Sequence, residues 1–377
     1  MVKLIFRSAL ILLVFHSAAL CANDETRLIK TIKKDYSLPA NGYVELINKY
    51  GQIVINPWAK DSVRVEVKIT AHGKDREDAE KLLERVEVDF RHTSPYLSME
   101  TVLDRKSGFF KEVWNNISDY SKTLLSKNKI EIDFEISLPA TASLDIENKF
   151  GNIYIREFEG KCNINLAHGD LRANKFFASS NIEVGYGNVR IKELMKGTLS
   201  LKGTETEIAK LGDIEIKSSS STVLIKEAGD IRLDSRGDQQ IRFNSLKSLK
   251  GKSTFSKIDV EAIEKSVSLD MTYGYVNIQS IPFSFDQIDI EGKYTDVHLH
   301  FMPGTYLLVD ITGKEDEITL PVADVKLDKQ YTDEKQRFVQ VKGSIGAKTN
   351  YPGSVNINTN GGEIVVEVPA AQQSANK

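Results

Sequence analysis

The chain of 377 residues has little cysteine, proline or tryptophan: 2, 9 and 2 residues, respectively. If Cys21 leaves with an N-terminal signal, Cys162 alone remains, which excludes an intrachain disulfide and a cysteine metal site. Cys162 alternates with apolar residues, so we predict a small buried filler. After residue 22 no apolar stretch is long enough to span a bilayer. No charge sign dominates either, because 50 basic and 53 acidic residues are interspersed, which argues against a nucleic-acid partner.

The first residues have the composition of a secretory signal. Lys3 and Arg7 precede an apolar run, residues 9–15, that is too short to cross a membrane, and small residues follow it. We predict that residues 1–22 form a signal peptide cleaved after Ala22, which leaves 48 basic and 53 acidic residues, a net charge of −5. The alternative is a lipoprotein modified on Cys21, but that processing favours a small residue where Leu20 stands.

Two segments repeat at an offset of one hundred residues. Residues 37–40, SLPA, recur as residues 137–140, and residues 48–55, NKYGQIVI, recur as residues 148–155, NKFGNIYI. In each copy a proline closes one apolar alternation and the next begins a few residues later. This order indicates strand, turn and strand.

A shorter unit, Gly or a substitute followed by a polar residue and an apolar-x-apolar pair, continues from the second copy. Its steps are 18, 18, 25, 17, 27, 18 and 21 residues, which predicts the turns of a β-solenoid over residues 139–369, with loops of varying length. Gly suits a tight corner, and stacked rungs together bury the apolar pairs. The units begin at Gly151, Gly169, Gly187, Gly212, Gly229, Ser256, Gly274 and Thr295, with a terminal copy at Gly362.

Residues 23–138 predict a β-rich module that carries a helix at 74–85, where Ala79, Leu82 and Leu83 share one face. Apolar residues of the insert 104–128 have roughly helical spacing. They favour a helix that caps the open end of the solenoid, and the alternative is contact with a partner or membrane surface. The small, polar tail 370–377 is predicted to be disordered. Alternation predicts strands at 43–47, 53–55, 63–70, 86–90, 97–103 and 129–138.

The order of these parts resembles a bacterial "putative adhesin" family of β-strand repeats, a domain of unknown function. The features that carry the resemblance are the Leu-Pro-Ala strand ends, the Asn-Lys-aromatic-Gly units, the helix at 74–85 and the Gly-[Asp/Asn]-apolar series, over about residues 30–368. The resemblance implies a solenoid of short strands, export to the cell envelope or beyond, and no assigned catalytic residue. The insert 104–128 is longer than the family's pattern requires.

Aromatic residues stand immediately before the corner residue of several units. We predict a stacked aromatic ladder inside or beside the corner, and the alternative is an exposed strip that stacks on sugar rings. The residues concerned are Tyr50, Phe150, Tyr186, Tyr273 and Tyr294.

Two further groups of side chains could bind a metal. His298 and His300 face the same side of a strand with Asp296, yet a zinc site needs a fuller ligand set, so exposed polar positions are favoured. Acidic corner residues could form a calcium row, but the dense glycine pattern of calcium β-rolls is absent and turn capping is favoured. These corner residues are Asp170, Asp213, Asp230 and Asp296.

The sequence predicts an all-β solenoid that is not an enzyme. It contains no nucleophile elbow, phosphate loop or zinc-protease helix, and its carboxylates are evenly spread. We expect an exported binding scaffold of the bacterial cell envelope, periplasmic, outer-membrane-associated or at the cell surface, without a cofactor. Its expected partner is an envelope protein or a glycan. The alternatives are an envelope protein that acts through a protein partner and a carbohydrate-active β-helix enzyme.

Overall fold

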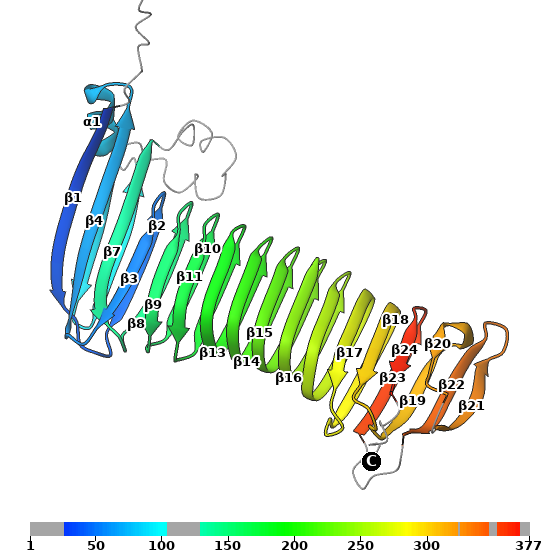
Figure 1. The fold of residues 1–377 in the computed structure, drawn as a ribbon. Coiled ribbons are helices and arrows are strands. Elements are labelled where there is room, and N and C mark those ends of the chain that lie inside the picture. The colour runs from blue at the N-terminus through cyan, green and yellow to red at the C-terminus, as the bar shows by residue number, and fades with distance from the viewer. Residues whose placement is uncertain (1–25, 104–128, 323–324, 347–352, 370–377) are drawn as a thin grey trace, which may run out of the picture.

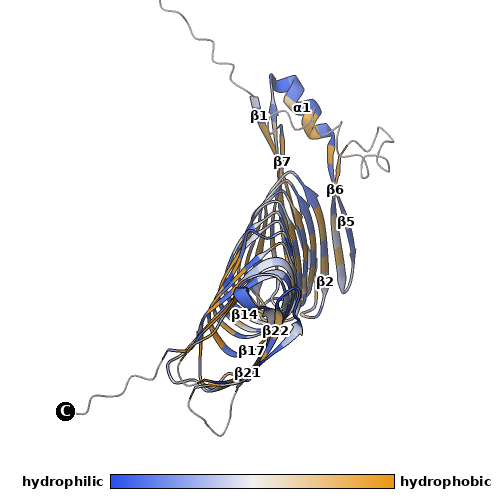
Figure 2. Ribbon diagram, turned by 90° about the vertical axis from the view of Figure 1, so that its right-hand side faces the viewer, coloured by the Kyte–Doolittle hydropathy of each residue, from blue (hydrophilic) through white to orange (hydrophobic). Residues whose placement is uncertain are grey.

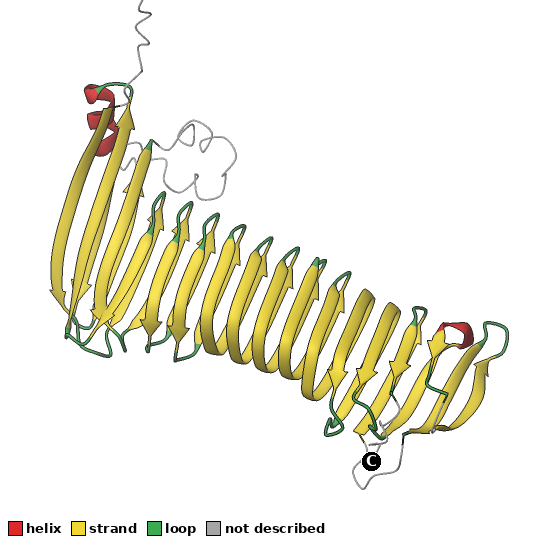
Figure 3. Cartoon of the chain, in the orientation of Figure 1, coloured by secondary structure: helices red, strands yellow, loops and turns green. Residues whose placement is uncertain are grey.

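The computed structural model describes residues 26–103, 129–322, 325–346 and 353–369. The predicted signal peptide 1–22, the insert 104–128 and the tail 370–377 lie outside these residues and stay predictions. The described chain forms one long stack of rungs, as Figure 1 shows. It is all-β apart from one α-helix and one short 3-10 helix (Figure 3), so the predicted fold class is confirmed.

Each rung of the stack crosses two faces, and neighbouring rungs pair in parallel. On the first face the spatial order is β5 (Val86–Thr93), β6 (Tyr96–Leu103), β2 (Tyr43–Lys49), β8 (Ser143–Lys149), β10 (Cys162–Ala167), β12 (Ser180–Gly185), the second halves of β13 (Asn188–Lys202), β14 (Glu205–Ser219), β15 (Thr222–Arg236) and β16 (Gln240–Thr254), the middle of β17 (Lys257–Ile281), the first half of β18 (Gln287–Phe301), β23 (Gly353–Asn360), β19 (Leu307–Lys314), β22 (Phe338–Ile345) and β21 (Val325–Asp333).

The second face is built from the other part of each rung. Its spatial order is β1 (Thr26–Ser37), β4 (Ser62–Gly73), β7 (Ile130–Pro139), β3 (Ile53–Trp58), β9 (Ile153–Phe158), β11 (Leu171–Phe176), the first halves of β13 to β16, the two ends of β17, the second half of β18, β24 (Ile364–Glu367) and β20 (Ile318–Thr319).

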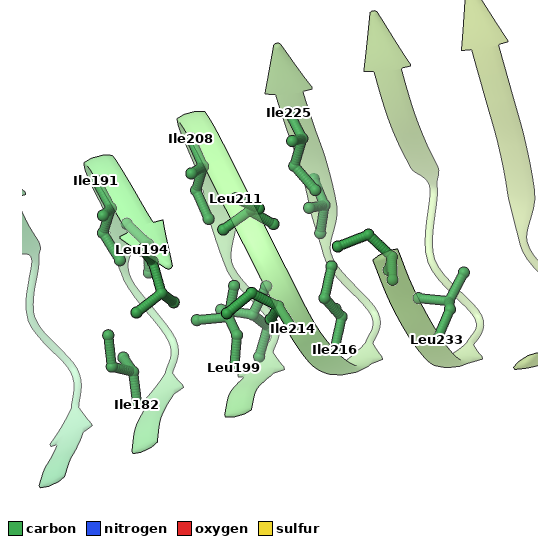
Figure 4. Close-up of a cluster of buried hydrophobic side chains, with 14 of the residues drawn as sticks. Ile182, Ile191, Leu194, Leu199, Ile208, Leu211, Ile214, Ile216, Ile225 and Leu233 are labelled. Carbon is green, nitrogen blue, oxygen red and sulfur yellow. The ribbon is translucent and has the colours of Figure 1, made fainter. Parts of the chain in front are cut away.

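The core lies between the two faces because strand side chains alternate in direction. In β10 the burial pattern alternates strictly between buried and exposed, and Cys162 is a buried filler as predicted. Ile182, Ile208 and Ile225 are among the apolar side chains that meet inside the stack (Figure 4), and Figure 2 looks along it. No single rung could bury these side chains, so the rungs stabilise one another.

The hundred-residue repeat is a pair of adjacent rungs. Tyr43 pairs with Ser143 and Lys49 with Lys149 along β2 and β8, while Ile53 pairs with Ile153 along β3 and β9. The two copies are similar because each presents the same face to the other. Pairing therefore continues across residue 138, and the division of the chain into a module and a solenoid stays a prediction.

Both ends depart from the order of the sequence. The rung of β2 and β3 lies between strands β6 and β7 and the rung of β8 and β9. At the other end, β23 and β24 lie between β18 and strands β19 and β20. Antiparallel pairs β1–β4, β5–β6 and β21–β22 complete the ends.

The predicted helix at 74–85 is confirmed as α1 (Arg76–Glu84). Its N-cap is Asp75, whose carboxylate accepts a 2.8 Å hydrogen bond from the backbone N–H of Asp78. Ala79 and Leu82 are buried against the end of the stack. In the part of the chain that the structure describes, no helix has the length and apolarity to cross a membrane.

The step lengths predicted from the glycine series are wrong. Gly151, Gly169 and Gly187 follow the corner that leads from the first face to the second, whereas Gly212 and Gly229 lie at the opposite bend, inside β14 and β15. The steps of 25 and 27 residues arose where the series changed from one bend to the other. Neighbouring rungs from β10 to β16 are 17 or 18 residues apart: Cys162 pairs with Ser180, Glu205 with Thr222 and Thr222 with Gln240.

Candidate functional site

The corner from the first face to the second, which we call the tight corner, contains one residue in the left-handed conformation on each rung. From Tyr50 to Tyr294 the φ angles of these residues lie between 50° and 63°. This region is disfavoured for residues with a Cβ, at roughly 1–2 kcal/mol. Most tight corners nevertheless carry a large side chain: the corner residues are Tyr50, Phe150, His168, Tyr186, Gly203, Ser220, Gly237, Phe255, Tyr273 and Tyr294.

The aromatic corner residues form two stacks on the outside of the molecule. In the first stack, ring centroids of Tyr50, Phe150, His168 and Tyr186 follow one another at 5.5, 5.2 and 5.1 Å, with interplanar angles of 5–9°. In the second stack, Phe255, Tyr273 and Tyr294 follow at 4.9 and 5.1 Å. We call the two stacks together the aromatic ridge.

The ridge is open to solvent. Tyr186 is 51% exposed, Phe255 62%, Tyr273 48% and Tyr294 57%. The five predicted aromatic residues therefore lie in a stack beside the corner, as expected, and their rings are not in the core. Burial raises the pKa of the Tyr50 hydroxyl, because Tyr50 lies at the better covered end of the ridge.

His168 and Phe255 belong to the ridge but the sequence prediction missed them. Both stand directly before a recognised unit, at Gly169 and Ser256, and have the same left-handed backbone as the others. The ladder was sought only among phenylalanine and tyrosine before glycine or threonine. An imidazole in register and a ring before serine were the available signals.

Gly203, Ser220 and Gly237 interrupt the ridge between its two stacks. Their corners are stabilised from the inside, by a chain of side-chain oxygens. The backbone N–H of Thr204 donates to Ser221 Oγ at 3.1 Å, that of Ser221 to Asp238 Oδ1 at 2.8 Å, and that of Asp238 to Ser256 Oγ at 3.0 Å. Asp238 is 3% exposed, and its carboxylate also accepts from Ser218 Oγ at 3.0 Å and Ser235 Oγ at 2.6 Å. We call this group the buried polar chain.

The corners of the first stack have glycine where the buried polar chain has oxygen-bearing side chains. A Cβ at Gly151 would lie 1.9 Å from Gly51 O, and one at Gly169 2.1 Å from Gly151 O. No side chain fits there, so the ring outside the corner has no counterpart inside. The amide of Asn148 instead donates to the carbonyl oxygens of Gly51 and Gly151, both at 3.0 Å.

Beside the first stack, an open depression of 550 Å³ lies on the outer side of the second face. Strands β3, β9, β11, β13, β14 and β15 contribute to it. Five of its lining side chains are cationic and one is a carboxylate: Arg156, Arg172, Arg190, Lys192 and Lys226, with Glu207.

The histidine pair does not assemble a metal site. His298 Nε2 lies 3.2 Å from Glu363 Oε2, and His300 Nδ1 lies 2.8 Å from Glu367 Oε2, so each histidine faces a different carboxylate. Residues 26–103, 129–322, 325–346 and 353–369 contain no group of three or more metal-ligating side chains.

The four acidic corner residues do not form one row. Asp170 Oδ1 accepts from the backbone N–H of Asn188 at 3.0 Å, and Asp296 Oδ1 from that of Glu363 at 2.9 Å, both beside the tight corner. Asp230, at the opposite bend, accepts from Lys247 at 2.8 Å. Turn capping is therefore confirmed for Asp170 and Asp296.

The chain thus belongs structurally to the all-β, solenoid-like proteins, and solved structures with this likeness include proteins called adhesins. A "putative adhesin" from Parabacteroides distasonis is 14% identical, over 71% of this chain and 95% of that one, with a TM-score of 0.33. A "putative lipid binding protein" from the same organism is 10% identical, over 70% and 92%, with a TM-score of 0.30. A "putative cell adhesion protein" from Clostridium sporogenes is 9% identical, over 89% and 99%, with a TM-score of 0.18. No family model and no curated protein matches the chain.

Proposed function

We propose that the protein is an exported, non-catalytic scaffold of the bacterial cell envelope that binds glycans on its aromatic ridge. One observation carries the proposal: the corners at Gly203, Ser220 and Gly237 adopt the same left-handed turn without a ring. The rings are therefore dispensable for the turn, and they stand at positions where glycine would relieve backbone strain. Exposed aromatic side chains in a contiguous row mark a binding surface.

The arrangement of the rings suits flat, partly apolar ligands such as sugars. Within a stack the ring faces cover one another, while the edges and the end faces stay open. Tyr186 ends the first stack above Gly203, where a Cβ would lie 3.0 Å from its Cδ1 atom. Phe255 begins the second stack. The two rings thus border an interval of three rungs with small corner residues, and a sugar could stack on either ring.

Residues 1–22 supply the export signal in this proposal, and neither a cofactor nor a metal takes part. The proposal places the chain in the periplasm, at the outer membrane or at the cell surface.

A glycan-array screen of residues 23–377 tests the proposal, with mass analysis of every retained sugar. We expect intact glycans to be retained, and the double variant Tyr186→Ser/Phe255→Ser to lose most of the signal. Phe283→Ser is the matched control, because Phe283 is 71% exposed and lies outside the ridge.

Three results of this screen contradict the proposal. Shortened glycans would indicate an enzyme. Retention that is unaffected by the double variant would place binding elsewhere. An array without any retained glycan would favour a protein partner of the envelope.

A further inference from the structure

The cations of the depression beside the first stack lack the ion pairs that are common on the rest of the solenoid. Lys247 pairs with Asp230 at 2.8 Å and Lys175 with Glu193 at 2.7 Å. Among the described residues, by contrast, no acidic group lies within 4.0 Å of the charged nitrogens of the four cations that we call the cationic cluster. These are Arg156, Arg172, Arg190 and Lys192, all of which are exposed.

The register of the rungs brings the cluster together. Arg172 pairs with Arg190 across β11 and β13, and Tyr154 of β9 pairs with Arg172. The Arg172 guanidinium lies 6.0 Å from the centre of the Tyr154 ring. Neighbouring strands lie about 4.8 Å apart. At that spacing the two guanidinium groups repel each other, so their juxtaposition has a cost that an anion between them would remove.

Short side chains leave room above the cluster. Ala209 follows Lys192 on the next rung, and Asn174 precedes it. Both contribute to the depression of 550 Å³. Guanidinium groups bind carboxylates with two parallel hydrogen bonds, which makes a planar carboxylate on a small scaffold a suitable occupant.

We propose that the cationic cluster makes the scaffold selective for acidic glycans, with the carboxylate of a uronate sugar on Arg172 and Arg190. This inference rests on the proposed function, because Phe150, His168 and Tyr186 of the aromatic ridge lie on the same three rungs as the cluster. The net charge of −3 on the whole chain disfavours a long polyanion, which would extend beyond the cluster onto acidic surface. A short acidic saccharide avoids that repulsion.

The test compares two probes that differ only in charge: an oligogalacturonate and its methyl ester. Titration calorimetry of the full chain at low salt should show the acid binding about tenfold more tightly than the ester. The double variant Arg172→Gln/Arg190→Gln should remove this preference and leave the affinity for the ester unchanged. High salt should also reduce the preference, because these groups are exposed.

A matched control exists on the opposite face. Arg232 and Lys250 are also cations paired on adjacent rungs, and they lie on the first face, away from the cluster. Arg232→Gln/Lys250→Gln lowers the net charge by the same amount and should leave the preference intact. An equal loss in this control would show that total charge, and not the cluster, selects the ligand.

The outcomes separate the two proposals. If the acid and the ester bind equally, and Tyr186→Ser/Phe255→Ser weakens both, the scaffold binds glycans but the inference about the cluster is wrong. If neither probe binds and the array is empty, the proposed function is wrong and the inference falls with it.

Discussion

The tight corners of the first stack and those of the interval have the same backbone but opposite side-chain arrangements. At Phe150, His168 and Tyr186 a ring covers the outside, and a glycine without room for a Cβ follows. At Gly203, Ser220 and Gly237 the outside is bare, and buried oxygens satisfy the backbone from within. A left-handed turn therefore needs only one of the two solutions. Phe255 with Ser256 combines both, which shows that the solutions are independent.

The largest effect should come from filling a corner where no Cβ fits. We expect Gly169→Ala to destabilise the chain by about 2–4 kcal/mol, because its Cβ would lie 2.1 Å from Gly151 O in the neighbouring rung. Gly185→Ala is the control, since nothing lies within 4 Å of a Cβ there. Thermal unfolding midpoints measure the difference. Equal midpoints would mean that the rungs at these corners are not so closely stacked.

The buried polar chain should be the next most sensitive feature. Asp238→Ala removes the acceptor of three hydrogen bonds, from Ser221 N, Ser218 Oγ and Ser235 Oγ, and leaves these donors buried. We expect a loss of about 2–3 kcal/mol in urea unfolding. Asp234→Ala, which removes only the exposed partner of Lys252 at 3.1 Å, should cost less than about 1 kcal/mol. Similar losses in both variants would contradict the role of the chain.

Two substitutions at one aromatic corner separate the ring from the backbone. Tyr273→Ala and Tyr273→Gly both lose the stacks with Phe255 and Tyr294, but only alanine retains the strain at φ 51°. We expect the glycine variant to be about 1 kcal/mol more stable than the alanine variant.

The reference position for this comparison is Gln279, an exposed residue of extended strand β17. There the order should reverse, with glycine less stable than alanine by about 0.5–1 kcal/mol. The same order at both positions in chemical unfolding would show that the tight corner is not strained.

The smallest effect concerns the C-terminal end, where exposed charges, rather than rings or buried oxygens, hold the last strand. Glu315, in the 3-10 helix η2 (Glu315–Glu317), is bonded by Lys329 and, at 2.6 Å, by Arg337, and these partners lower its pKa to about 2. Because the folded pKa is depressed, the stabilisation is present above the ordinary value of 4.5 and is lost as the pH falls towards 2.

Hydrogen exchange of β21 measures this effect. Glu315→Gln should reduce amide protection in β21 at neutral pH, and the variant and the parent should converge as the pH falls through that window. A difference that persists at the lowest pH would show that the charge of Glu315 is not the cause.

Local patterns predicted the strands, but not the register that assembles the site. Alternation in residues 162–167 and 180–185 was sufficient for β10 and β12, and the repeat at residues 48 and 148 corresponds to neighbouring rungs. The glycine series failed as a measure of the rung because glycine and aspartate suit both bends. Arg172 and Arg190 are ordinary exposed residues of two strands in the sequence. Only the 18-residue register places them side by side.

The insertion of β23 and β24 between β18 and the pair β19 and β20 constrains the order in which the chain can fold during synthesis. Rungs from β8 to β18 can be added one after another as the chain emerges, because each pairs with its predecessor. The neighbour of β18 emerges last among the described strands, so the edge of β18 stays open until then. An open parallel edge is a template for pairing with other chains. Chains that terminate before residue 353 should therefore aggregate, although every rung up to β18 is complete.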